Sequence, residues 1–149
     1  KSFKFHLGHF VNQYSLLSSG DIKVFGVGAD YSKGPNTIRI QRGIIQPRVA
    51  NVAFNFNNGT YRRNLTAINI TRKINKDLKV GLNGALSGDN LNTLEISPTA
   101  NLPQKSATLS FTGNYKVDKN TQISGEIANS SWAPNALLAD TLREFGLIM

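Results

Sequence analysis

The sequence predicts an all-β protein whose strands run antiparallel in up-and-down order. Apolar residues alternate with small polar residues in eight separate segments of the 149-residue chain. Because side chains point alternately to the two sides of a strand, this period gives each segment one apolar and one polar face. Most segments are joined by turns too short for a helical crossover, which favours consecutive hairpins.

Eight expected strands share the alternation, and their bounds are 2–11, 22–31, 37–45, 50–57, 61–74, 78–86, 106–117 and 121–130. In the first strand, phenylalanines alternate with Lys4 and His6, and in the second, apolar residues alternate with glycines. In the third, isoleucines alternate with Arg39 and Gln41, and in the fourth, phenylalanines alternate with asparagines. Each segment therefore has the period of a half-buried strand.

The later expected strands repeat the pattern. In the fifth, isoleucines alternate with Ala67 and Asn69, and in the sixth, leucines alternate with Lys79 and Asn83. The seventh shows the clearest alternation, with leucine, phenylalanine and tyrosine on one face and threonine, serine and asparagine on the other. In the eighth, isoleucines alternate with serine and Glu126.

Turn-forming residues separate these strands. Residues 33–36 (Lys-Gly-Pro-Asn) and 57–60 (Asn-Asn-Gly-Thr) contain the glycine, proline and asparagine that tight turns prefer. Short turns are also expected at 75–77 and 118–120, whereas residues 87–104 form a long polar connection. Short turns at one end and longer loops at the other are typical of outer-membrane barrels.

The alternation divides the chain into two regions. Residues 1–132 are expected to form the antiparallel β-barrel region, and residues 133–149 a C-terminal tail. In that tail Leu138, Leu142 and Phe145 have helix-like spacing, so it is expected to be either a short helix or a truncated continuation.

The distribution of charge favours lipid over a protein core as the cover of the apolar face. Charged residues make up 17% of the chain, against roughly 25% in ordinary soluble domains. The apolar faces are free of charge in the middle, and Arg42 and Arg72 fall near segment ends. A soluble sandwich usually carries lysine and glutamate on its outer strand faces. The expected fold is therefore an up-and-down transmembrane β-barrel of about eight strands, or an arc of a larger barrel. Its expected lipid-facing residues are Phe54, Phe56, Ile68, Ile70, Leu109 and Phe111.

Neither nucleic-acid binding nor catalysis is expected. The net charge is +8, but no three basic residues are contiguous. His6 and His9 are the only histidines and fall on opposite faces of one strand, so they cannot chelate one metal ion. Residues 89–92 (Asp-Asn-Leu-Asn) lack the glycine and glutamate of a calcium loop. There is no cysteine. We therefore expect no enzyme activity, no catalytic residue, no cofactor and no metal.

Three stretches resemble recurrent motifs of one family. Residues 3–9 (Phe-Lys-Phe-His-Leu-Gly-His) and 24–31 (Val-Phe-Gly-Val-Gly-Ala-Asp-Tyr) form the first, and residues 86–102, with Ser-Gly-Asp-Asn-Leu-Asn-Thr and Ile-Ser-Pro-Thr-Ala-Asn-Leu, the second. Residues 121–130 (Thr-Gln-Ile-Ser-Gly-Glu-Ile-Ala-Asn-Ser) form the third. Together they resemble large outer-membrane β-barrel proteins of Bacteroidetes-type bacteria, although Gly88 replaces the first of two acidic residues in the loop motif.

This resemblance implies a wall-forming protein of the Gram-negative bacterial outer membrane, with a structural, export or assembly role. Membrane lipid and other outer-membrane or secretion-machinery proteins are the partners it implies. The alternative from a different class is a secreted soluble β-sandwich module for binding or adhesion, which would use loops such as 87–104 to contact its ligand.

Overall fold

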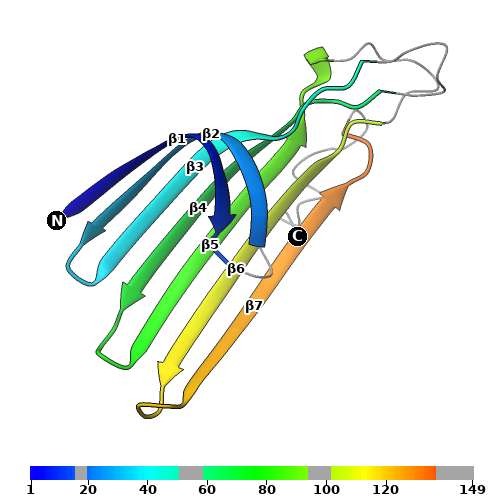
Figure 1. Cartoon of the computed structure of the whole chain (residues 1–149). Helices are drawn as coiled ribbons and strands as arrows, with labels where there is room; N and C mark the ends of the chain where they lie inside the picture. The colour runs from blue at the N-terminus through cyan, green and yellow to red at the C-terminus, as the bar shows by residue number, and fades with distance from the viewer. Residues whose placement is uncertain (16–19, 51–58, 94–101, 137–149) are drawn as a thin grey trace.

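Seven antiparallel strands form one sheet in the computed structural model, which describes residues 1–15, 20–50, 59–93 and 102–136 (Figure 1). Every strand pairs with its neighbour in the sequence, in the order β1-β2-β3-β4-β5-β6-β7. The strands are β1 (Ser2–Gln13), β2 (Gly20–Lys33), β3 (Asn36–Gln46), β4 (Arg63–Lys73), β5 (Leu78–Asp89), β6 (Lys105–Lys116) and β7 (Gln122–Ala133). A single-turn 3-10 helix, η1 (Leu91–Thr93), follows β5.

The predicted all-β class, antiparallel pairing and up-and-down order are confirmed. Seven of the eight expected segments are strands. The expected strand at 50–57 lies almost wholly outside the described residues, and so do Phe54 and Phe56. The nearest described feature is an isolated antiparallel bridge between Val49 and Thr60.

The sheet is open: the described part of the chain does not close into a barrel. Within that part, β1 pairs only with β2 and β7 only with β6, and the backbone of each edge strand is hydrogen-bonded on one side. Closure needs pairing between the first and last strands, which a hydrophobic pattern does not encode. β7 continues to Ala133, the first residue of the expected tail, and residues 137–149 lie outside the described residues.

The two faces of the sheet differ in burial. On β4, Leu65, Ala67 and Asn69 are buried, whereas Ile68 and Ile70 are exposed on the opposite face. We call the face that carries Asn69 the inner face and the face that carries Ile70 the outer face. The register extends this division across the sheet, because Asn69 lies opposite Asn83 and Ile70 lies opposite Ile38 and Leu82.

A small apolar core lies at one end of the inner face. It consists of Val24, Leu65, Ala67 and Ala85, and Phe10, Tyr14, Ile22 and Ile45 pack against it. The residues after β1 supply one of these contacts, because the sheet curls and brings Tyr14 and Ser15 over the inner face (Figure 1). The core is narrow because the middle of the inner face carries polar side chains.

The hairpin turns gather at one end of the sheet. The β2–β3, β4–β5 and β6–β7 connections all lie there, and we call it the short-turn end (Figure 1). Gly34 has a φ of 56°, which fits the predicted turn at 33–36, and Gly59, in the other glycine-containing turn, has a φ of 66°. At the opposite end, β5 extends to Asp89 and is followed by η1, so the connection expected to begin at residue 87 starts later.

Candidate functional site

Large apolar side chains are exposed along the outer face of all seven strands. Leu7 on β1 is 83% exposed and Ile127 on β7 is 79% exposed. The exposed apolar residues of this face are Phe3, Phe5, Leu7, Val11, Phe25, Val27, Tyr31, Ile38, Ile40, Ile68, Ile70, Leu82, Leu86, Leu109, Phe111, Tyr115, Ile123 and Ile127. They form an apolar surface that reaches from one edge of the sheet to the other.

Four of the six residues expected to face lipid lie on this surface. Ile68, Ile70, Leu109 and Phe111 are all exposed and point to the outer face. The remaining two, Phe54 and Phe56, lie outside the described residues. The four described residues make the outer face the candidate site of contact with an apolar environment.

Two arginines also point to the outer face. Arg72 lies one residue from the end of β4, as expected, but Arg42 lies four residues from the end of β3, opposite Val27 and Thr66. A long arginine stem can lie along apolar surface while its charged head reaches toward water. The outer face is therefore apolar in composition but carries one charge nearer its middle than the sequence indicated.

The inner face carries a row of polar side chains across five adjacent strands. Asp30 on β2, Arg39 on β3, Asn69 on β4, Asn83 on β5 and Ser110 on β6 lie opposite one another in register. The amide of Asn69 donates to Asn83 Oδ1, and Asn83 Nδ2 donates to Ser110 Oγ at 3.0 Å. The last three of these side chains are buried. A hydrogen-bonded polar row thus replaces an apolar core at the centre of this face.

His6 on β1 takes part in this arrangement. Its Nε2 lies 3.3 Å from Asp30 Oδ2, and Arg39 Nε lies 3.9 Å from the same oxygen. Burial raises the pKa of Tyr14 to about 12; the negative charge of Asp30 adds to this, and Arg39 opposes it. The raised pKa keeps the Tyr14 phenol neutral.

The sequence offered no local signal for this cluster, because its members come from four separate parts of the chain. Only the register of β1, β2 and β3 brings His6, Asp30 and Arg39 together. The alternation of apolar and polar residues predicts that these three residues lie on polar strand faces, but it does not predict which strands are neighbours. Arg39 Nε and Gln41 Nε2 are buried without a hydrogen-bond partner among the described residues.

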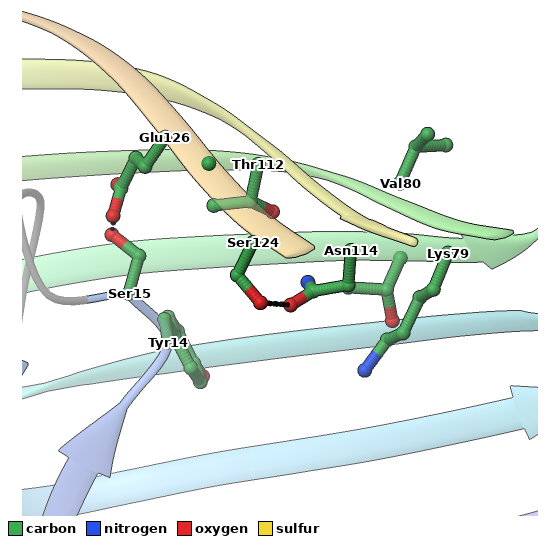
Figure 2. Close-up of a pocket in the computed structure, with 10 residues that line it drawn as sticks. Tyr14, Ser15, Lys79, Val80, Thr112, Asn114, Ser124 and Glu126 are labelled. Atoms are coloured by element: carbon green, nitrogen blue, oxygen red, sulfur yellow. Dashed lines mark hydrogen bonds between the residues drawn. The ribbon is translucent and has the colours of Figure 1, made fainter. Parts of the chain in front are cut away.

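A hollow of about 290 Å³ lies on the inner face between Tyr14 and the β6–β7 hairpin (Figure 2). The Ser15 hydroxyl donates to Glu126 Oε1 on one side of it, and Ser124 Oγ donates to Asn114 Oδ1 at 2.7 Å on the other. Lys79 and Asn114, on adjacent strands, also line this space (Figure 2). The lining includes one positive side chain, Lys79, and one negative side chain, Glu126.

Asp89, a residue of the stretch first compared with a calcium loop, serves the fold. Arg63 Nε and Nη2 donate to its two carboxylate oxygens at 2.7 and 2.9 Å, and the Gln104 backbone N–H donates to it at 2.9 Å. Both oxygens are thus already engaged. Across the described ranges of the chain, no three histidine, cysteine or acidic side chains come together as metal ligands.

Comparison of the chain with protein-family models, curated proteins and solved structures finds no match. Within the described segments, no helix combines the length and apolarity that crossing a bilayer requires. The resemblance to large outer-membrane barrel proteins therefore stays a prediction.

Proposed function

We propose that this chain forms part of the wall of a bacterial outer-membrane β-barrel and has a structural, export or assembly role. One observation carries the proposal: an exposed apolar face extends over all seven strands, and the opposite face is polar at its centre. In a transmembrane barrel, strands alternate between residues that face lipid and residues that face the lumen. The outer face fits the first role, and the inner face, with Asn69, Asn83 and Ser110, fits the second.

The size of the apolar surface supports contact with lipid. Six aromatic side chains on the outer face, Phe3, Phe5, Phe25, Tyr31, Phe111 and Tyr115, are between 39% and 70% exposed. At roughly 150–250 Å² per aromatic side chain, these six alone present on the order of 600 Å². The largest apolar patch of a typical soluble monomer is only about 300–600 Å² in total. Twelve further apolar residues extend the surface, so a hydrocarbon environment fits the outer face better than water does.

The open edges favour an arc of a larger wall over a small closed barrel. In hydrocarbon, an unpaired backbone N–H or C=O group costs several kcal/mol, so every strand must pair on both sides. Among the described strands, β1 and β7 each pair on one side only. We therefore propose that further strands continue the sheet beyond both edges.

The alternative, a secreted β-sandwich module, needs a second sheet to cover the outer face. The described residues form one sheet, and all their strands belong to it. A monodisperse protein in buffer without detergent would favour the sandwich, whereas partition into detergent with heat-modifiable migration would favour the wall.

Nitroxide labels on neighbouring residues test the proposal. Labels at Ile70 and Phe111 point to the outer face, and matched labels at Thr71 and Thr112, one residue further along, point to the inner face. After reconstitution into vesicles, we expect lipid-dissolved oxygen to relax the first pair and a water-soluble nickel complex to relax the second. Labels at Ile70 and Phe111 that report tight protein packing and no access to oxygen would overturn the membrane assignment.

A further inference from the structure

Two lysines face each other on the inner face at the short-turn end of the sheet. Lys73 near the end of β4 lies directly opposite Lys79 near the start of β5. Like charges in directly opposed positions of an antiparallel pair destabilise the pairing. The two lysines line a second hollow, next to the one beside Tyr14, together with Lys116 at the end of β6 and Lys76 in the β4–β5 turn. The fold therefore concentrates positive charge at a position where sheet stability alone would disfavour it.

This positive charge is not neutralised within the described part of the chain. No carboxylate there forms an ion pair with Lys73, Lys79 or Lys116. The one described acid that lines the hollow is Asp77, so four lysines leave it with a net charge of about three positive units. Asp77 takes part in the backbone hydrogen bonds of the turn: its carbonyl accepts from the Lys116 N–H at 2.8 Å, and its own N–H donates to Asn75 Oδ1 at 2.8 Å.

Amide donors complete the lining. Asn114 Oδ1 accepts hydrogen bonds from Ser124 Oγ at 2.7 Å and from Gln122 Nε2 at 3.3 Å. Because the oxygen of Asn114 is used twice, its Nδ2 is the group left to donate. Figure 2 shows the Lys79 ammonium and the Asn114 amide on the same side of the sheet. Ammonium and amide groups thus line one open space of about 550 Å³.

We propose that this hollow, which we call the lysine hollow and define by Lys73, Lys76, Lys79, Lys116, Asn114 and Gln122, binds a phosphate-bearing ligand. Lysine binds phosphate as a compact point charge, and a phosphate monoester carries about −1.5 to −2 charges at neutral pH. A volume of about 550 Å³ falls within the range of small-molecule sites. A bound phosphate would also relieve the repulsion between Lys73 and Lys79. The proposal rests on the inner face and does not depend on what covers the outer face.

Calorimetric titration of the full chain with inorganic pyrophosphate tests the site. The protein is refolded in a non-ionic detergent, because a phosphocholine headgroup would compete for the lysines. We expect one pyrophosphate per chain, with affinity that falls as sodium chloride is raised. Lys73→Gln and Lys79→Gln should each weaken binding by about tenfold or more, since each removes a charge-assisted hydrogen bond. Lys79→Arg keeps the charge and should bind within a few-fold of wild type.

Lys33→Gln is the matched control, because Lys33 lies at another hairpin of the short-turn end but does not line the hollow. It should bind pyrophosphate as wild type does. A second titration with short-chain phosphatidylglycerol, below its micelle concentration, distinguishes the sources of phosphate. Binding of pyrophosphate assigns the site to soluble phosphate compounds, and binding of the lipid alone assigns it to a headgroup. If wild type binds neither, or if Lys73→Gln and Lys79→Gln bind both ligands as wild type does, the proposal is wrong.

Discussion

Asn69 and Asn83 face each other across β4 and β5, and the side-chain amide of Asn69 donates a hydrogen bond to the side-chain oxygen of Asn83. They are 3% and 1% exposed, whereas Ile70 and Leu82, their neighbours in sequence, are 40% and 45% exposed. This sheet therefore buries asparagine and exposes isoleucine, the reverse of a soluble protein. An apolar environment on the outer face would make that distribution favourable.

Removing the centre of the polar row should destabilise the sheet. Asn83→Ala leaves the Asn69 amide and Ser110 hydroxyl without their shared partner in a buried position. An unsatisfied buried polar group costs about 1–3 kcal/mol, so the free energy of unfolding should fall by at least that amount. Urea unfolding in detergent micelles, followed by circular dichroism, measures the change. Ser124→Ala, on the exposed part of the same face, should change it little; equal losses for the two variants would contradict the role of the row.

A charge introduced on the outer face should oppose membrane insertion. If Ile70 faces lipid near the middle of the bilayer, Ile70→Lys should cost about 2–4 kcal/mol of folding free energy in vesicles. Thr71→Lys, on the inner face, should cost much less because its ammonium group stays in water. Folding titrations in phosphatidylcholine vesicles compare the two variants. Equal costs would place both residues in the same environment and contradict the proposed orientation.

The ion pair between Arg63 and Asp89 should stabilise the end of β4 and β5 opposite the short turns. The Asp89 side chain is only 4% exposed and receives two hydrogen bonds from the guanidinium group. Removing one partner of a buried pair leaves an uncompensated charge and costs on the order of 3 kcal/mol. We expect Arg63→Ala to lower the free energy of unfolding by about this amount. Arg63→Lys should retain only part of the stabilisation, because lysine cannot form the bidentate contact with the Asp89 carboxylate.

Chemical denaturation of Arg63→Ala beside Arg48→Ala, a change at an exposed arginine, checks this prediction. The control should unfold at nearly the wild-type urea concentration. If Arg63→Ala does the same, the ion pair contributes nothing measurable to stability.

Asp118 should make the β6–β7 turn sensitive to acid. Its carboxylate Oδ1 accepts hydrogen bonds from the Asn120 and Thr121 backbone N–H groups at 2.7 and 2.9 Å. The bond from Asn120, followed by those from Thr121, lowers the pKa of Asp118 below its ordinary value of 3.8. A depressed pKa in the folded state contributes stability that is complete above 3.8 and is lost as the pH falls through the folded-state value.

Amide NMR shifts of Asn120 and Thr121, recorded from neutral pH to below 3.8, should follow this titration. Asp118→Asn keeps an acceptor oxygen without a titrating group, so its turn amides should hold their shifts over the same range. Movement of these shifts in Asp118→Asn would show that another group causes the change.

The local sequence pattern determined which face of the sheet each strand residue occupies and where the hairpins turn. Side-chain direction in a strand depends only on the backbone of that strand, so a period of two was enough to assign Ile70 and Phe111 to one face and Asn69 and Thr112 to the other. Turn residues such as Gly34 and Asn36 likewise marked the hairpin ends, because their conformational preferences are local.

Pairing between distant strands decided the rest. Whether Lys73 meets Lys79, or His6 meets Asp30, depends on register, and a change of register moves every contact along the strand. The open edges at β1 and β7 are also a property of the whole sheet, because closure requires the first and last strands to meet in space. Sequence alone therefore determined which way each side chain points, and only the tertiary structure decided which side chains lie together.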